Sequence, residues 1–247
     1  MHEQQSLSTQ MRAITISREY GSGGGEVARR VAVRLGWQLV DHQMVVHIAQ
    51  SLGVSESEIE QKDEYSESFA SRILSSMRLI DPAMAVGVPV DALTTTEEAY
   101  RQALTNLVHA VAQTGHAVIV GRGSQVLLAD LRDVLHVRIV APIEQRITYV
   151  VQREGLDRDA ARTRIQQKDR QRERYLQNHY HQSSEDPHLY DLVLNTGIID
   201  LDSIAEIITL ALERKATRLT AHKEELGPGA GSSRYTGQAE DFRPSIN

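Results

Sequence analysis

The residues in this sequence most suited to chemistry form a glycine-rich run, Gly21-Ser22-Gly23-Gly24-Gly25, which follows a short apolar segment over 13–16. Glycines let backbone N–H groups converge on an anion, and a helix that starts after such a loop adds the positive end of its dipole. The alternative is a tight strand-to-helix turn without a ligand. Four glycines in five residues exceed what a turn requires, so we predict a phosphate-binding loop.

The loop departs from the common pattern G-x-x-x-x-G-K-[ST], in which lysine contacts the β- and γ-phosphates and a hydroxyl binds Mg²⁺. In register with that pattern, Gly24 stands at the lysine position and Gly25 and Glu26 stand at the Ser/Thr positions. Arg18 lies near the first glycine, and lysine occurs only at positions 62, 168, 215 and 223. We therefore expect arginine, with Arg18 the nearest candidate, to supply the positive charge.

Three further positions could serve a ligand. Glu26 could hold a metal ion, or it could favour the dipole of the helix that it opens. Arg122 lies between two glycines after the apolar segment 117–120, where its long side chain can reach a ligand or form a structural ion pair. Asp41 ends the segment over 38–41 and could face the site or cap the next helix.

The segment over 153–182 is polar and rich in arginine. Because Ile165 and a few alanines are the apolar residues between Asp157 and Arg174, a helix there is not a core helix. A lid that closes over phosphates is one interpretation, and a solvated helix with acidic–basic pairs is the other. The histidines at 179, 181 and 188, with Asp186, match no zinc spacing and indicate a polar loop.

The elements that must position these residues alternate along the chain. Apolar segments over 13–16, 38–41, 117–120, 134–140 and 192–194 predict strands. Apolar positions at helical spacing lie between them, one helix ending at Gly36 and another opening at Pro142. This alternation predicts an α/β fold with a parallel sheet and helices on both faces. Ligands in such folds bind at the carboxyl ends of the strands.

Composition limits the classes of function. The chain has 247 residues, a formal charge of −6 and no cysteine, so thiol chemistry is excluded and no nucleic-acid partner is expected. With neither a signal peptide nor a membrane span expected, the default is a cytoplasmic protein. We predict a flexible leader over 1–11, one domain over 12–222 and a disordered tail over 223–247, with a helical insertion at about 42–96.

The ordered series of motifs resembles the cytidylate kinase-like family, a divergent branch of the bacterial cytidylate kinases. The resemblance spans roughly residues 12–213 and is weakest from about 50 to 100. It rests first on residues 17–24, the helix that follows them, and Asp41. It continues at Gly121-Arg122-Gly123, at the helix that Pro142 opens, at Lys168-Asp169 with Arg172 and Arg174, and at residues 192–196. No single motif is decisive.

This resemblance implies a nucleoside monophosphate kinase of the P-loop NTPase type, with a substrate-binding insertion and an arginine-bearing lid. It implies transfer of the γ-phosphoryl group of ATP to CMP or dCMP, with Mg²⁺. Asp41 would lie near the acceptor nucleotide and Arg122 would contact its phosphate. The lid and its flanks would contain Lys168, Asp169, Arg172 and Arg174. We therefore expect Arg18, Arg122 and Arg172 to be catalytic, and the glycine loop to bind phosphate.

Two departures leave the function open. Active kinases keep the loop lysine, although its absence is typical of the cytidylate kinase-like branch. They also carry a Tyr-Arg pair where this chain has Val46 and His47, so one phosphate contact is missing. The hypotheses are an active nucleotide kinase, a nucleotide-binding regulatory module without catalysis, and a kinase for another small acceptor. Fold alone does not decide among them.

Overall fold

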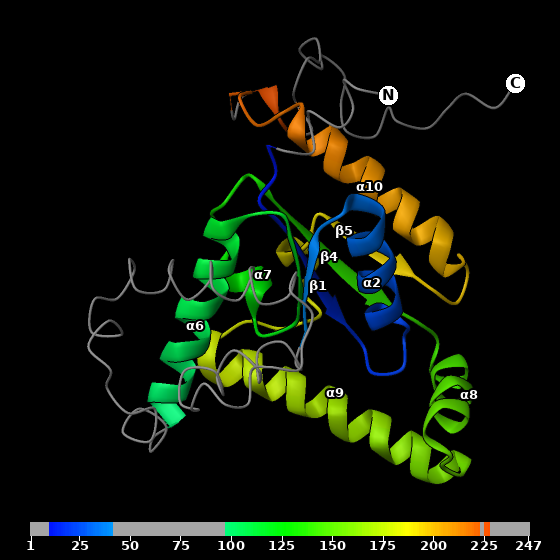
Figure 1. The fold of residues 1–247 in the computed structure, drawn as a ribbon. Coiled ribbons are helices and arrows are strands. Elements are labelled where there is room, and N and C mark those ends of the chain that lie inside the picture. Colours follow the sequence, from blue (N-terminus) through cyan, green and yellow to red (C-terminus); the bar gives the residue numbers. More distant parts are fainter. Residues whose placement is uncertain (1–9, 42–96, 223–224, 228–247) are drawn as a thin grey trace, which may run out of the picture.

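The computed structural model describes residues 10–41, 97–222 and 225–227. The predicted insertion over 42–96, including Val46 and His47, and most of the predicted leader and tail lie outside these ranges. In chain order the elements are β1 (Ala13–Arg18), α2 (Gly24–Leu35), β2 (Gln38–Val40), α6 (Glu97–Thr114), β3 (Ala117–Val120), α7 (Ser124–Leu127), β4 (Val134–Val140), α8 (Ile143–Glu154), α9 (Arg158–Tyr180), the 3₁₀ helix η3 (Pro187–Leu189), β5 (Leu192–Asn195) and α10 (Leu201–Ala216) (Figure 1).

The strands form a parallel sheet in the order β2-β3-β1-β4-β5. β1 is central, and its Ile16 pairs with Val120 of β3 and Val137 of β4. β3 is buried at every residue, and β1 and β4 are buried except at their last residues, because helices cover both faces. Continuous apolar runs are the expected sequence of such strands. The predicted fold class is therefore confirmed.

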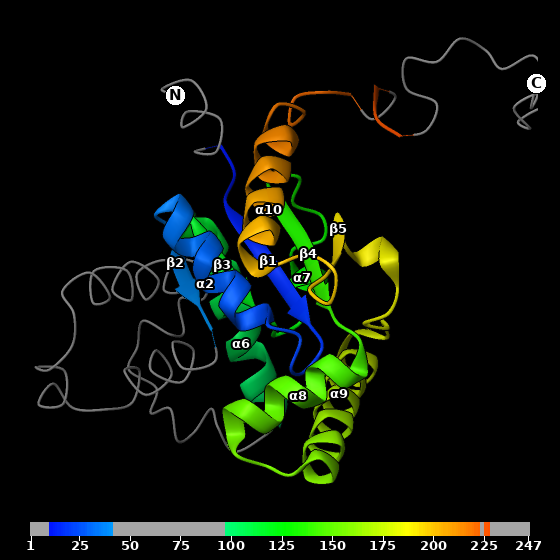
Figure 2. The same cartoon turned by 90° about the vertical axis from the view of Figure 1, so that its right-hand side faces the viewer.

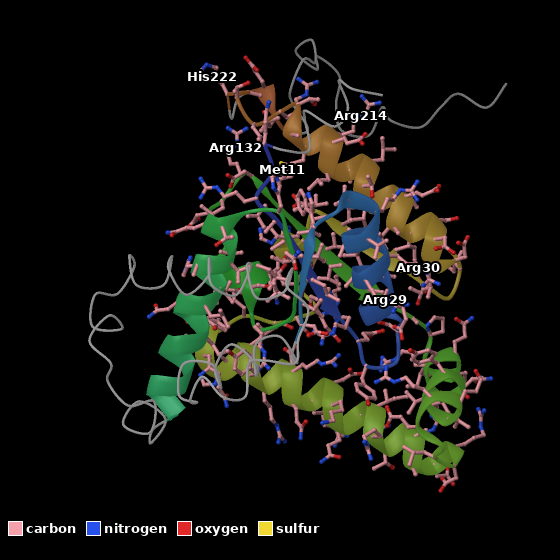
Figure 3. All side chains as sticks on the ribbon, in the orientation of Figure 1. Met11, Arg29, Arg30, Arg132, Arg214 and His222 are labelled. Atoms are coloured by element: carbon pink, nitrogen blue, oxygen red, sulfur yellow. The ribbon has the colours of Figure 1, made fainter. Side chains whose placement is uncertain are left out.

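Two apolar cores lie on the two faces of the sheet. One combines strand residues with Val27 and Val31 of α2 and with Ile204 and Ile208 of α10. The other places α6 and the following loops against β2, β3 and the start of β1. Figures 1 and 2 show α2 and α10 on one side of the sheet and α6 on the other. Met11, predicted as the last residue of the leader, is only 1% exposed and lies at the end of the sheet opposite α9 (Figure 3).

Helices α8 and α9 form a hairpin beyond the carboxyl ends of the strands (Figures 1 and 2). Its small core contains Ile147 and Val150 of α8 and Ala161 and Ile165 of α9. α9 is 23 residues long, but its buried residues are only Ala161, Ile165 and Leu176. Burial this sparse agrees with the prediction that it is not a core helix, and it leaves most of α9 available for polar contacts with the loop after β1.

Candidate phosphate-binding site

The glycine loop connects β1 to α2 and has the backbone of an anion cradle. Gly21 and Gly23 have φ of 80° and 76°, which L side chains rarely adopt. Gly23 is the N-cap of α2 and provides no side chain to cap it. A Cβ placed on Gly25 would have no neighbour within 4 Å. No hydrogen bond among the described residues uses the backbone N–H of Gly24, Gly25 or Glu26, so these donors at the start of α2 are available to a phosphate.

The side chain of Arg18 packs over Gly24, the loop residue at which the common pattern has lysine. A Cβ on Gly24 would lie 2.7 Å from the Cβ of Arg18 and 3.1 Å from its Cγ. The guanidinium ends beside Gly121, where an added Cβ would overlap its Nη1. Burial, followed by the charges of Arg172 and Arg122, lowers the pKa of Arg18 to about 9, and Asp41 opposes this change. The side chain therefore remains charged at neutral pH.

Arg122 and Arg172 approach Arg18 from two other elements. Arg122 has φ of 65° between Gly121 and Gly123, so the backbone after β3 turns sharply at this residue. Arg172 of α9 donates from Nη1 to the carbonyl oxygen of Arg18 at 2.8 Å. Burial is also the largest cause that lowers the pKa of Arg172. Within the described ranges, neither Arg18 nor Arg172 forms an ion pair with a carboxylate.

The α8–α9 hairpin is held on the loop by a hydrogen-bonded network around Asp169. One oxygen of this carboxylate accepts from the backbone N–H of Tyr20 at 2.7 Å, and the other is bonded to Arg146. Arg146 also pairs with Glu19 at 3.2 Å, and Glu19 accepts from the N–H of Ala141 at 3.0 Å. Burial raises the pKa of Asp169, against the effect of these donors.

Two tyrosine–glutamate contacts add to this docking. Tyr149 of α8 donates to Glu26, and Tyr20 of the loop donates to Glu154. Burial, followed by the hydrogen bond to Glu26, raises the pKa of Tyr149. Glu26, predicted as a possible metal ligand or a dipole partner, thus bonds to the hairpin. In the described part of the chain, no group of three acidic or histidine residues could hold a metal ion.

The other predicted site residues are placed in different ways. Ser22 is 2% exposed, and its hydroxyl donates to the carbonyls of Glu19 and Ile139, so this hydroxyl stabilises the loop. Lys168 lies on the cleft side of α9 together with Asp169 and Arg172. Arg174 is exposed and does not line the cleft, because two residues after Arg172 a helix has turned by about 200°.

A cleft of about 760 Å³ lies between the carboxyl ends of the strands and α9. Seven basic side chains and four acidic ones line it. Three of the acids already bond elsewhere: Glu19 and Asp169 hold Arg146, while Glu173 accepts from the hydroxyl and N–H of Ser184 at 2.6 and 2.9 Å. The remaining positive charge indicates that the cleft accommodates an anion.

Sequence reasoning missed Arg138 and Arg146. Arg146 is 5% exposed and connects Glu19 to Asp169, and its position one turn into the helix after Pro142 was the available signal. Arg138 is 8% exposed on β4 and faces the cleft. A charged residue within an apolar strand was the signal for Arg138.

The parallel sheet in this strand order, with a glycine loop after its central strand and an arginine-bearing helix over the cleft, defines a kinase-like P-loop fold. The chain belongs to the cytidylate kinase-like family, whose model matches residues 13–198. The predicted family is thereby confirmed. Within the described ranges, no helix has the length and apolar character needed to cross a membrane.

Three similar proteins extend this comparison. A cytidylate kinase of Thermococcus kodakarensis is 34% identical over 113 residues, 44% of this chain and 56% of that protein. A uronate isomerase of Corynebacterium glutamicum is 28% identical over 156 residues, 63% of this chain but only 30% of that protein. An uncharacterised protein of Eubacterium ventriosum shares the fold with a TM-score of 0.60 and 20% identity, covering 83% of this chain and 99% of its own.

Proposed function

We propose that this protein transfers the γ-phosphoryl group of ATP to CMP or dCMP. The observation that carries the proposal is the convergence of Arg18, Arg122 and Arg172 beside a lysine-free glycine loop, in a member of the cytidylate kinase-like family. Phosphoryl transfer depends mainly on positioning and on positive charge around the transferred group. Three guanidiniums from three elements meet that requirement.

Arg18 takes the role that lysine has in other loops of this kind. Its stem fills the space over Gly24, and its guanidinium lies between the loop and Gly121. A phosphoryl group moving from the loop towards Arg122 would pass this cation. Since the pKa of about 9 keeps Arg18 charged at neutral pH, it can neutralise charge that develops in the transition state.

The loop fits the phosphates of a nucleotide better than it fits a resident metal ion. Gly21, Gly23 and the open start of α2 provide N–H groups for the β- and γ-phosphates. For Mg²⁺, the loop offers the carboxylate of Glu26 in place of a Ser/Thr hydroxyl. Mg²⁺ binds through few carboxylates and mainly through substrate phosphates, where it would neutralise charge. Glu26 could complete its shell if Tyr149 releases it.

Asp41 and Arg122 are the candidate acceptor contacts. Both interact electrostatically with Arg18, at the β2 and β3 side of the cleft. Arg122 would bind the acceptor phosphate, and Arg172 with Lys168 would approach from α9. Arg174, exposed and outside the cleft, is left out of this assignment.

The test is a coupled ADP-release assay with ATP, Mg²⁺ and a panel of nucleoside monophosphates. We expect turnover with CMP or dCMP, and a loss of about 10²-fold or more in Arg18→Gln and Arg122→Gln. Arg158→Gln, which changes an exposed residue paired with Glu144, is the matched control and should keep full activity. Turnover only with another acceptor would correct the substrate, and no turnover across the panel would overturn the kinase.

A second function is favoured by the docked hairpin. Asp169 accepts from a loop N–H and Glu26 bonds to Tyr149, so acidic side chains contact the loop where a nucleotide would add phosphates. A regulatory module that binds nucleotide without turnover would show this arrangement. It predicts that ATP raises the melting temperature although no ADP is released.

A further inference from the structure

Arg138 is a buried cation whose environment differs from that of a structural arginine. It lies on β4, opposite Ser17 of β1 and Val193 of β5, and is 8% exposed. Arg146 is buried to the same degree, at 5%, and pairs with both Glu19 and Asp169. Buried charges are costly unless they are paired, and Arg146 follows that rule.

Arg138 has no such partners in the part of the chain that the structure describes. No carboxylate there forms an ion pair with it, and no acceptor hydrogen-bonds its guanidinium. Its Cζ lies 5.7 Å from the ring centroid of Tyr190, which is a cation–π contact. None of its nitrogens is among the fully enclosed polar atoms without a partner. The N–H groups of Arg138 therefore reach open cavity space.

Arg138 separates two cavities. One is the basic cleft under α9, and the other, of about 630 Å³, lies on the β4–β5 side. The wall of this second cavity is mainly apolar, formed by Val140, Ala141, Pro142, Tyr190 and Val193. Arg138, Glu19 and Glu185 are its charged residues, and Arg138 is the buried cation among them. A largely apolar wall with a few polar groups is typical of a small-molecule site.

We propose that the second cavity is a binding site for a phosphorylated small molecule, with its phosphate on the guanidinium of Arg138 and its apolar part along Pro142 and Tyr190. Arg172, close enough for its charge to act on Arg138, adds positive potential on the cleft side. Glu19, which also lines this cavity, is bonded to Arg146 and to the N–H of Ala141. Glu185, the other carboxylate of the lining, is exposed and forms no ion pair with Arg138 among the described residues. The planar N–H donors of the Arg138 guanidinium match the oxygens of a phosphate, whose second negative charge strengthens these hydrogen bonds beyond those to a carboxylate.

This site shares Glu19, Arg138 and Glu185 with the wall of the basic cleft, but it lies outside the residues proposed for phosphoryl transfer. Arg122 and Asp41, the candidate acceptor contacts, do not line the second cavity, and neither does any of Gly21 to Gly25. The cavity lies instead along β4 and β5.

The test uses phenyl phosphate as the probe and the full chain as the protein, with binding followed by phosphorus-31 line broadening and titration calorimetry. We expect phenyl phosphate to bind the unchanged protein and to bind Arg138→Gln about tenfold or more weakly. Arg158→Gln, at an exposed position outside both cavities, should bind as the unchanged protein does. Saturating ATP should not displace the probe.

Four results would overturn the site: no binding of phenyl phosphate, equal binding by Arg138→Gln, displacement of the probe by ATP, or equally strong binding of benzoate. If Arg138→Gln fails to fold, Arg138→Lys keeps the charge but loses the planar pair of N–H donors. Binding by Arg138→Lys should be several-fold weaker, and unchanged binding would count against the proposal. Failure of ATP to bind would contradict the proposed kinase, whereas the phenyl phosphate result would still decide this site.

Discussion

The stem of Arg18 occupies the space in which a side chain at Gly24 would begin. A Cβ on Gly24 would lie 2.7 Å from the Cβ of Arg18, closer than such atoms approach in proteins. Compared with the common loop pattern, glycine replaces the lysine at Gly24 and arginine replaces the first glycine at Arg18. These two replacements depend on each other, and together they are an exchange of the two residues. Arginine reaches the cleft from the end of β1, and Gly24 gives it room.

The first prediction follows from this exchange. Gly24→Lys should not improve phosphoryl transfer, because its Cβ forces Arg18 to move, and overpacking costs about 1–3 kcal/mol of unfolding free energy. The double variant Arg18→Gly with Gly24→Lys should recover part of the activity lost in either single variant. Coupled ADP release and chemical denaturation measure the two effects.

Gly25→Ala is the control for this first prediction. Its Cβ would have open space and its φ is not in the left-handed region, so the free energy of unfolding should stay equal or rise slightly. Higher activity in the single variant Gly24→Lys than in the unchanged protein would contradict the exchange.

The second prediction concerns the guanidinium of Arg18. Gly121→Ala places a Cβ against Nη1 of Arg18, whereas Gly115→Ala meets nothing within 4 Å. The two glycines have nearly equal φ, 77° and 79°, so both variants should lose about 1 kcal/mol of unfolding free energy. Only Gly121→Ala should also lose phosphoryl transfer, which steady-state assays of both variants would measure. If Gly121→Ala and Gly115→Ala lose activity equally, backbone strain alone explains the loss, and contact with Arg18 does not contribute.

The strands and the helices around them could be predicted because each has a local pattern. The apolar run 134–140 coincides with β4, and Gly36 ends α2 with φ of 66° as a C-cap glycine. The site could be predicted only in part. Arg18 was identified from its position before the glycines, but its path over Gly24 depends on tertiary packing that a linear pattern does not contain.

The same limit applies to other contacts of the site. Asp169 was predicted as a lid residue and lies on α9, and its bond to the N–H of Tyr20 joins segments 149 residues apart, which no local pattern indicates. Ser22 was predicted to bind phosphate, and the sequence did not indicate that its hydroxyl bonds to carbonyls of Glu19 and Ile139. Arg138 lies in a strand whose pattern predicts burial, so only the cavities beside it indicate a ligand. Contacts between distant segments decided each case.

The third prediction tests the docking of the α8–α9 hairpin on the glycine loop. Asp169→Asn should weaken the bonds to Arg146 and to the N–H of Tyr20, because a neutral amide is a poorer acceptor than a carboxylate. Hydrogen exchange at the Tyr20 amide should become about tenfold faster. Glu144→Gln, which removes exposed pairs with Arg158 and Arg162 on the same hairpin, should leave that amide unchanged. Unchanged exchange in Asp169→Asn would show that the network does not hold the hairpin.

The fourth prediction concerns the pH dependence of stability. His136 lies in the sheet, 7% exposed, with its Nδ1 hydrogen-bonded to Thr15 Oγ1 at 2.8 Å. Burial, with a smaller contribution from Lys215 and against the effect of Asp191, lowers the pKa of His136 from 6.5 to about 4. Between these two values the unfolded chain binds more protons than the folded one. The free energy of unfolding should therefore fall as the pH falls through this window, by roughly 3 kcal/mol at pH 4.

Urea denaturation between pH 4 and pH 8 measures this dependence. His136→Gln cannot titrate, so the slope of its free energy of unfolding against pH should be smaller than that of the unchanged protein, even if the variant is less stable at every pH. His188→Gln removes an exposed histidine and should keep the original slope. Equal slopes in His136→Gln and the unchanged protein would mean that other groups, such as buried carboxylates, control the acid side of stability. A reduced slope would identify His136 as a core residue that must stay neutral for β1 and β4 to remain packed.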